Sequence, residues 1–501
     1  MKRKLKIAIA SFLSLALILS VTACGNSEGS VGSGGGNGGG GAGEPERSTN
    51  AEFGDLVEYI QGSNLSDSLD KDLKVEKKIK WLSWWVIDET QAAAELFKSV
   101  YGIPEYGNGD YGDDANNIFD NIYVAYADRY DQLGKLVASG DSPDIFQFEI
   151  TNFPYTAYKG LFQPIDDYVD LSDPLWDRTR DAMKQFQWGG KNYCALATVN
   201  LDDVMWYRRS VVAEAGMKEP LDYYREGNWT WDTFLDMCDT WQKTGEGRYA
   251  TDGWRVPDKL VLTTGVPIIG IVDGKLQDNF YNADIERCMT NVIDVLYKQD
   301  YRYPRDILNG WSINPNAWFQ GDILFYVDLT TVYTDTFQGY IKRYKLDPSD
   351  LFCVPMPRDP NANAYYQSFK NDSYMLVGGS KNTNGFAAWT QCVIATAYDE
   401  QTKAIGREQS KVNYNYTDEL LDWLDELQFG DALTPVFDFK GGIGQDLVDG
   451  NTVYNPVDVL TQIPYLNCLD SEGNPATFTT LRAANEDKVR TRINDLNASL
   501  G

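Results

Sequence analysis

The chain has 501 residues, of which 43% are hydrophobic, so it is long enough to bury a sizeable core and to form two or more domains. Its formal net charge of -28 argues against nucleic acid or an anionic membrane surface as a partner, because both attract positive protein surfaces. The absence of histidine removes the usual metal ligand, the usual general base and the usual partner of a nucleophilic serine or cysteine.

The first residues have the pattern of a bacterial signal peptide. Basic residues between Lys2 and Lys6 precede an apolar run, 7–21, that is shorter than the roughly 20 residues needed to cross a bilayer. Small residues end this run directly before Cys24, and the arrangement resembles a bacterial lipobox. The resemblance implies removal of a lipoprotein signal peptide, residues 1–23, and lipidation of Cys24. The alternative is an ordinary secretory signal in which Cys24 is incidental.

The segment after Cys24 is a predicted linker. Residues 25–43 are almost entirely Gly, Ser, Asn and Ala, and such a segment cannot bury enough apolar surface to fold. We therefore expect residues 24–75 to consist of the lipidated cysteine and a flexible linker that tethers the folded part to the membrane. Several acyl chains anchor a protein stably, whereas one chain binds reversibly.

Strand-like and helix-like patterns then alternate along the chain. The patterns predict strands over 78–87, 118–126 and 144–148, helices over 90–101 and 130–139, and a turn over 140–143. Gly102 is expected to stop the first helix. Alternation of this kind predicts an α/β fold with largely parallel sheets.

A series of motifs in this order resembles the extracellular solute-binding proteins that serve sugar ABC importers. The motifs are LGKLVASGDSPDIF at 133–146, KGLFQPIDDY at 159–168, GKNY at 190–193, VMWYRR at 204–209, EAG at 214–216, WTWDTF at 229–234, FQGDILFY at 319–326, VPMP at 354–357 and GSKN at 379–382. The resemblance extends roughly over residues 76–400. Trp229 and Trp231 fit the start of a helix, with Thr230 at the N-cap, and are expected to be structural.

The resemblance implies a two-lobed periplasmic-binding-protein-like fold of type II, whose lobes are joined by a hinge that the chain crosses more than once. Carried onto this sequence, lobe 1 comprises residues 76–199 and 356–405, and lobe 2 comprises residues 204–355 and 406–501. The first crossing is expected near 200–203, after a strand that ends at Ala197, and the second near 354–357. Hinge residues absorb backbone rotation while each lobe stays rigid.

The aromatic content supports a sugar ligand independently. Aromatic residues make up 13% of the chain, with 14 Trp and 31 Tyr. Sugar rings present flat C–H faces to aromatic side chains, and their hydroxyl groups need polar partners. Such side chains are expected at the carboxyl ends of strands that face the cleft.

Nine residues are candidate ligand contacts: Trp84, Trp85, Asp88, Phe148, Glu149, Asp202, Asp203, Trp206 and Asp328. Trp84 and Trp85 are neighbours on a predicted strand and point in opposite directions, so one of them is expected in the core. Core packing is also the alternative for Trp206. Asp144 is expected to close a turn. Thr330, Thr331 and Tyr333 stand near the position where maltose-type relatives place a stacking tryptophan.

No metal or other cofactor is expected. The six cysteines after Cys24 have no CxxC spacing and fit scattered core residues. They are Cys194, Cys238, Cys288, Cys353, Cys392 and Cys468. The formation of one or two disulfides among them is an open alternative. The acidic segment 108–117 could be read as a calcium loop, but it lacks the residue order and closing glutamate of an EF-hand. An exposed acidic loop is the expectation.

Together these features predict a monomeric binding protein, not an enzyme, on the extracellular face of the bacterial membrane. It would be lipid-anchored, capture a carbohydrate such as an oligosaccharide, and deliver it to the permease of an ABC importer. One alternative is a surface glycoside hydrolase, in which Asp202 and Glu149 would face each other across a cleft. The other is a sensor, or a receptor for another solute, on the same fold.

Overall fold

The computed structural model describes residues 56–84, 91–103, 117–150, 152–253, 256–303, 314–333, 337–444 and 477–500. The predicted signal peptide, Cys24, the linker up to residue 55, Trp85, Asp88, Cys468 and most of segment 108–117 lie outside these residues. The chain divides into two compact units. Unit 1 comprises Met1–Phe146 and Ser380–Asn413, and unit 2 comprises Gln147–Gly379 and Tyr414–Gly501. The lobe boundaries expected from the sequence remain a prediction.

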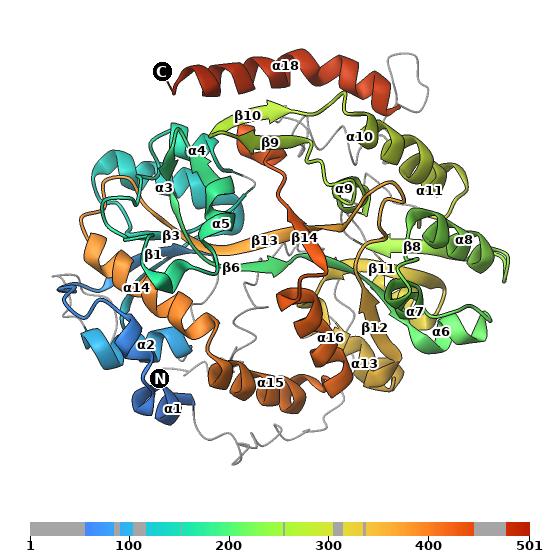
Figure 1. Cartoon of the computed structure of the whole chain (residues 1–501), viewed down its shortest axis with the longest axis horizontal. Helices are drawn as coiled ribbons and strands as arrows, with labels where there is room; N and C mark the ends of the chain where they lie inside the picture. Colours follow the sequence, from blue (N-terminus) through green and yellow to red (C-terminus); the bar gives the residue numbers. More distant parts are fainter. Residues whose placement is uncertain are drawn as a thin grey trace, which may run out of the picture. The chain divides into compact units, whose positions relative to one another are not determined.

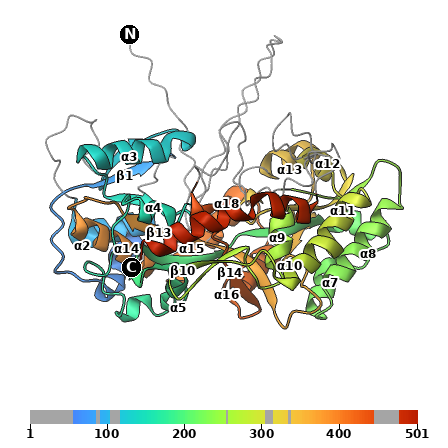
Figure 2. The same ribbon diagram turned by 90° about the horizontal axis from the view of Figure 1, so that it is seen from above.

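Unit 1 is built on parallel strands covered by helices on both faces. Strand β1 (Ile79–Ser83) pairs in parallel with β2 (Phe119–Tyr123) and, through Trp81 and Ile145, with β3 (Ile145–Gln147). Helix α3 lies on one side of these strands, and α2 and α14 lie on the other (Figures 1 and 2). The helical segments are α1 (Leu56–Gly62), η1 (Leu65–Ser68), α2 (Ala92–Tyr101), η2 (Tyr126–Asp128), α3 (Arg129–Ser139), α14 (Thr383–Ala397) and α15 (Glu400–Tyr414).

Aromatic packing forms the centre of unit 1. Trp81 is buried on β1, with its ring centroid 5.2 Å from Phe119 and 5.8 Å from Trp389 of α14. Lys80, the preceding residue, forms an ion pair of 2.6 Å with exposed Asp141. The alternation of an apolar and a charged side chain is what a strand with differently solvated faces requires. It fixes which side of β1 faces the core.

The predicted elements of unit 1 are confirmed, with shorter strands than the patterns indicated. Helix α3 begins one residue before the predicted 130–139 and ends at the same residue. Helix α2 ends before Gly102, which has a φ of 76° that glycine adopts without strain. Strand β1 stops at Ser83 and β2 at Tyr123, because Trp84 bends away and Tyr126 begins a 3₁₀ turn.

Unit 2 contains a four-stranded mixed sheet in the order β12-β7-β11-β8. Strand β7 (Asp203–Arg208) is antiparallel to both β12 (Leu351–Val354) and β11 (Ile323–Leu329), whereas β11 is parallel to β8 (Tyr249–Gly253). The prediction of largely parallel sheets therefore holds for unit 1 and is wrong for this sheet. Local patterns along single strands carry no signal for the direction of the neighbouring strand.

Two long strands form a second part of unit 2. Strand β6 (Cys194–Leu201) is antiparallel to β13 (Tyr365–Leu376), and the first residues of β13 pair in parallel with β14 (Leu433–Val436). The sequence predicted a strand end at Ala197, but β6 continues to Leu201 because β13 supplies backbone partners along its whole length. Two short hairpins are formed by β4 (Gln187–Trp188) with β5 (Lys191–Asn192), and by β9 (Ile269–Val272) with β10 (Lys275–Asp278).

Helices cover the strands of unit 2, and the last helix runs along the β9–β10 hairpin (Figure 1). Asn497 of this helix exchanges hydrogen bonds of 2.9 and 2.8 Å with the backbone of Leu276. The helices are α4 (Tyr155–Tyr158), α5 (Arg180–Met183), α6 (Arg209–Glu214), α7 (Pro220–Arg225), α8 (Trp231–Gln242), α9 (Val256–Leu262), α10 (Ala283–Cys288), α11 (Asp294–Lys298), α12 (Pro315–Gln320), α13 (Gln338–Tyr344), α16 (Asp418–Phe429) and α18 (Phe478–Ala498). The shorter helical segments are the 3₁₀ turns η3 (Pro174–Trp176), η4 (Lys184–Phe186), η8 (Pro348–Asp350) and η9 (Lys440–Ile443), and the π-helical segment η5 (Met289–Ile293).

The loop between β12 and β13 is held by two tryptophans at the start of α8, as the sequence predicted for structural residues. Trp229 Nε1 donates to the Pro355 carbonyl at 2.8 Å, and Trp231 N donates to the Arg358 carbonyl at 3.0 Å. The indole of Trp231 is held in turn by Thr263, after α9, to whose Oγ1 its Nε1 donates at 2.9 Å. Thr230 takes the N-cap position, although its side chain makes no capping hydrogen bond.

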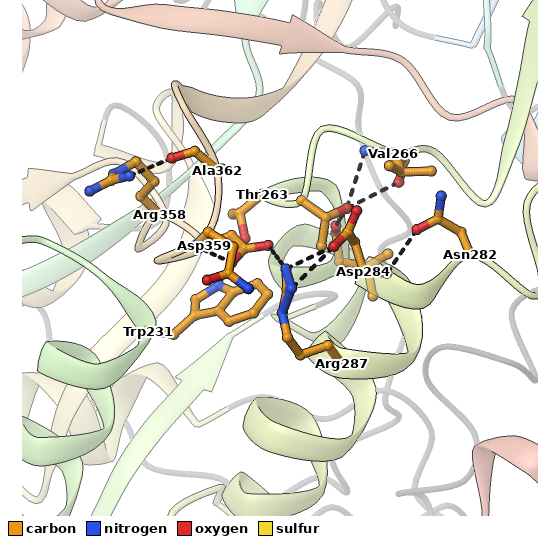
Figure 3. Close-up of polar contacts among 12 residues, drawn as sticks. Trp231, Thr263, Val266, Asn282, Asp284, Arg287, Arg358, Asp359 and Ala362 are labelled. Atoms are coloured by element: carbon orange, nitrogen blue, oxygen red, sulfur yellow. Dashed lines mark hydrogen bonds and ion pairs between the residues drawn. The ribbon is translucent and has the colours of Figure 1, made fainter.

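An arginine of α10 fastens the same loop. Arg287 pairs with Asp359 in the loop and with Asp284 of its own helix, and its guanidinium lies 5.5 Å from the Trp231 ring centroid (Figure 3). Within the loop itself, the Arg358 side chain donates a hydrogen bond to the Ala362 carbonyl at 2.5 Å. These contacts fix the segment through which the chain enters β13.

Candidate functional site

In unit 1, aromatic side chains gather where β1 and β2 end. The two strands run in parallel, and Val124 N donates to the Ser83 carbonyl at 3.0 Å, so their carboxyl ends share one edge. Trp84 directly follows β1 and is half-buried. Tyr123 and Tyr126 follow on the β2 side and are 53% and 38% exposed. This edge therefore presents the kind of flat surface that a sugar ring favours.

Arg129, at the start of α3, packs against three aromatic rings near this edge. Its guanidinium carbon lies 3.6 Å from the Tyr126 ring centroid, 4.8 Å from that of Tyr130 and 5.2 Å from that of Trp84. Cation–π contacts with several rings hold each ring in a fixed plane. Arg129 is buried, so most of its surface is committed to these rings. The sequence singled out Trp84 but gave no sign that Arg129 supports it.

In unit 2, three of the predicted aspartates lie at one end of the four-stranded sheet, where the side chains of Asp203 and Asp328 point to opposite faces. Because β7 and β11 are antiparallel, the first residue of β7, Asp203, lies opposite Leu329, and Asp328 lies opposite Val204. Asp202 precedes β7, and its carbonyl accepts a hydrogen bond from Thr330 N at 3.4 Å. All three aspartates are buried.

Gly253 ends β8 at the same edge and shows how closely the strands approach. Its φ is 116°, and a Cβ atom placed there would lie 2.0 Å from the Val327 carbonyl oxygen. Glycine is the residue that combines this conformation with such a close backbone contact. The edge is therefore shaped by backbone packing as well as by its carboxylates.

Lys259 of α9 joins the two aspartates at the start of β7. Its Nζ contacts the Asp202 carboxylate, lies 2.6 Å from Asp203 Oδ2 and donates to Ser368 Oγ at 2.8 Å. All four side chains are buried. A buried ammonium group shared by two carboxylates is costly to break, since removing one partner leaves an uncompensated charge. We infer a structural role for Lys259, which the sequence did not single out.

The remaining predicted contacts are placed as follows. Trp206 is fully buried, donates from Nε1 to the Leu329 carbonyl at 3.2 Å, and packs on Phe337 with centroids 5.3 Å apart. Phe148 is buried against Phe153 and Phe186, while Glu149 is half-buried. Trp85 and Asp88 lie outside the described residues. Ligand contact by these residues remains a prediction.

Asp144 behaves as the sequence predicted for a turn residue. Its carboxylate accepts hydrogen bonds from Lys80 N at 2.9 Å, Ser380 Oγ at 2.6 Å and Asn382 Nδ2 at 3.0 Å. Burial raises the pKa of Asp144, and these hydrogen bonds oppose the rise. Both carboxylate oxygens are satisfied inside unit 1, so the side chain is structural.

The five described cysteines after residue 24 are buried and form no disulfide with one another. Burial raises the pKa of each of their thiols, so they act as small apolar core residues. Across the described ranges, no group of three or more Cys, Asp or Glu side chains is arranged to hold a metal ion. In the same part of the chain no helix has the length and apolarity to cross a bilayer.

Known proteins share this architecture. The family model "Bacterial extracellular solute-binding protein" matches residues 114–405, which is more than half of the chain. No match to the sequence was found among curated proteins.

Solved structures with the same fold cover most of the chain. The galacto-N-biose/lacto-N-biose I-binding protein of an ABC transporter from Bifidobacterium longum matches with a TM-score of 0.56 at 12% identity, covering 85% of this chain and 99% of its own. The GacH receptor of Streptomyces glaucescens matches with a TM-score of 0.54 at 15% identity, covering 84% and 100%. An ABC substrate-binding protein from Listeria monocytogenes matches with a TM-score of 0.51 at 14% identity, covering 85% and 99%.

At these identities the structures establish the fold, and the family model establishes the membership. The α/β architecture of both units agrees with the periplasmic-binding-protein fold that the sequence predicted. The glycoside hydrolase alternative is thereby set aside, because the family consists of receptors. The chain belongs to the bacterial extracellular solute-binding proteins.

Proposed function

We propose that the protein is the lipid-anchored substrate-binding component of an ABC importer and that its ligand is a carbohydrate, expected to be an oligosaccharide. The main support is the aromatic edge of unit 1, where Arg129 packs against exposed Tyr126 and half-buried Trp84, and where Tyr123 is also exposed. Flat aromatic surfaces next to hydrogen-bonding groups suit the alternating faces and hydroxyl groups of sugars.

The ligands of structurally similar receptors support the same class. The Bifidobacterium longum protein was solved with lacto-N-biose, the GacH receptor with acarbose, and the Listeria monocytogenes protein with cycloalternan. All three ligands are carbohydrates or carbohydrate-like. Binding would favour a closed form of the receptor that the permease recognises, because a ligand shifts a conformational equilibrium by its differential affinity.

Thermal unfolding of the full chain in detergent, followed by tryptophan fluorescence, tests the ligand class. Acarbose, cycloalternan, lacto-N-biose and β-1,6-galactobiose would be screened beside amino acids and short peptides. A ligand at a hundred times its Kd adds roughly 2.7 kcal/mol to the unfolding free energy, so a binder should raise Tm by several degrees. A rise with peptides alone would contradict the carbohydrate assignment and favour a receptor for another solute.

The anchor is tested separately at Cys24. In the bacterial host we expect the wild-type protein to partition with the membrane and the Cys24→Ser variant to appear in the soluble fraction, because the serine hydroxyl cannot carry the thioether-linked lipid. Mass spectrometry of the N-terminal peptide would show the acyl groups directly. An unmodified wild-type N-terminus would indicate an ordinary secretory signal.

A further inference from the structure

One face of the β6–β13 strand pair carries a row of buried polar side chains. Thr198 lies directly opposite Asp372, and Asn200 lies opposite Lys370, so these four side chains project from the same face of the antiparallel pair. Thr198 and Asn200 are each 1% exposed, and Asp372 is 8% exposed. We call Thr198, Asn200 and Asp372 the polar row.

Each residue of the polar row has a buried polar atom without a hydrogen-bond partner. The atoms are Thr198 Oγ1, Asn200 Nδ2 and Asp372 Oδ1, and none of them finds a partner in the structure. A buried polar atom left unpaired costs roughly 1 to 3 kcal/mol, and native proteins contain few of them. Three such atoms on neighbouring positions of one strand pair mark a place where the protein itself supplies too few polar partners.

The backbone at this point is also irregular. The register between β6 and β13 shifts between Asp372 and Ser373, so one strand carries an extra residue next to the polar row. Bulges of this type re-aim side chains and are common beside functional sites. Here the shift falls at the pair formed by Thr198 and Asp372.

We infer that the polar row binds the hydroxyl groups of an uncharged, polyhydroxylated ligand, an inference that rests on the proposed function. The three side chains supply a hydroxyl, an amide donor and a carboxylate acceptor, which is the mixture that vicinal hydroxyl groups require. Opposite residues of the pair lie about 5 Å apart and next-but-one residues about 7 Å apart, dimensions that match one sugar ring. Because the row is buried in the structure, ligand binding there requires that this face of the strand pair become accessible.

The charges around the row favour a neutral ligand over a sugar acid. Asp372 and, further along the pair, Asp202 both place carboxylates on this side. Lys259 forms ion pairs with Asp202 and Asp203, and Lys370 already has an interaction partner within the protein. A ligand with a carboxylate or phosphate would therefore meet net repulsion, whereas a hydroxyl group donates to Asp372 without it.

Two substitutions that keep side-chain shape test the inference. Calorimetric titration of the full-chain wild type, Thr198→Val and Asp372→Asn would use acarbose, cycloalternan, lacto-N-biose and β-1,6-galactobiose, with digalacturonate as the anionic comparison. We expect neutral sugar to bind the wild type more tightly than digalacturonate. Its Kd should rise about fivefold in Thr198→Val and tenfold or more in Asp372→Asn, because the latter loses a charge-assisted hydrogen bond.

Thr156→Val is the matched control. Thr156 is buried in unit 2, but its hydroxyl donates to the Asn152 carbonyl at 2.9 Å, so the valine variant should lose stability and keep the wild-type Kd. Without ligand, Thr198→Val should be at least as stable as the wild type, since the hydroxyl that it removes has no partner. A loss of stability in Thr198→Val equal to that in Thr156→Val would overturn the inference.

The affinity should also depend on pH. Burial raises the pKa of Asp372 to about 6, against the opposing effects of Lys370 on the same strand and of a hydrogen bond from Gln147 at the end of β3. The wild type should bind neutral sugar more weakly at pH 5 than at pH 7.5, and Asp372→Asn should lose this difference.

The outcomes separate the two proposals. Tight binding of a neutral sugar with unchanged Kd in Thr198→Val and Asp372→Asn would overturn the inference and leave the proposed function intact. Preference for digalacturonate would overturn the assignment of a neutral ligand. A wild-type protein that bound none of the sugars would contradict the proposed function and the inference together.

Discussion

Two buried aspartates, one in each unit, show how differently the same side chain can be used. Asp144 of unit 1 accepts three hydrogen bonds, from Lys80 N, Ser380 Oγ and Asn382 Nδ2. Asp372 of unit 2 is buried to a similar degree, yet its Oδ1 has no partner in the structure. Burial raises the pKa of both groups.

Burial alone therefore does not distinguish a structural carboxylate from a binding one. A satisfied carboxylate replaces its lost hydration with protein donors and stabilises the fold. A carboxylate with an unpaired oxygen lowers stability and retains the capacity to accept a ligand hydroxyl. Substitutions at these two carboxylates and at two buried threonines test this difference.

Removing the fully hydrogen-bonded carboxylate of Asp144 should have the largest effect on stability. Asp144→Ala would leave Lys80 N, Ser380 Oγ and Asn382 Nδ2 without their acceptor, and we expect the unfolding free energy to fall by about 3 to 4 kcal/mol. Urea unfolding followed by tryptophan fluorescence would measure the change. A loss below about 1 kcal/mol would show that Asp144 is not the anchor of its turn.

Replacing the carboxylate of Asp372, one oxygen of which has no partner, should change stability in the opposite direction. Asp372 has a folded-state pKa of about 6, above its unfolded value of 3.8, so its contribution to stability is lost as pH rises from about 4 to 6. Asp372→Asn removes that loss of stability, and we expect a gain of about 3 kcal/mol at pH 7.5 and none at pH 3.5. Chemical unfolding across this pH range would measure it.

Asp438 provides the control for that experiment. Burial raises its pKa to about 6 as well, but its carboxylate accepts hydrogen bonds from Ile268 N, Ile269 N and Lys440 N at 3.2, 3.1 and 2.9 Å. Asp438→Asn should therefore lose stability at pH 7.5, where Asp372→Asn gains it. Equal stability changes in Asp372→Asn and Asp438→Asn would contradict the distinction between a hydrogen-bonded and an unpaired carboxylate.

The smallest effect is expected from the two buried threonines. Thr156→Val should cost about 1 kcal/mol, because it removes a hydroxyl that donates to the Asn152 carbonyl. Thr198→Val should change stability by less than about 0.5 kcal/mol or increase it, because valine suits a buried strand. Thermal unfolding of the unliganded variants would resolve the difference.

Much of unit 1 could be predicted because its signals are local. Helical spacing predicted α3 to within one residue, Gly102 marked the end of α2, and the turn before β3 was expected to be closed by Asp144. The ordered motifs predicted the family and the fold, which the family model and solved structures confirm. The two tryptophans at the start of α8 were correctly expected to be structural.

The polar row could not be predicted, because it exists only through pairing. Thr198 and Asn200 interrupt an otherwise apolar strand in the sequence, but nothing there shows that Asp372, far along the chain, lies opposite Thr198. Arg129 and Lys259 were missed for the same reason, since their roles depend on rings and carboxylates that come from other elements.

Residue type and short-range spacing were enough to predict the family, the alternation of strands and helices, and the apolar character of the described cysteines. Tertiary structure decided strand direction in unit 2, the register of β6 and β13, and which buried polar atoms find partners. These properties arise from contacts between distant segments, whose geometry is fixed by backbone pairing and packing and is not encoded in any local pattern.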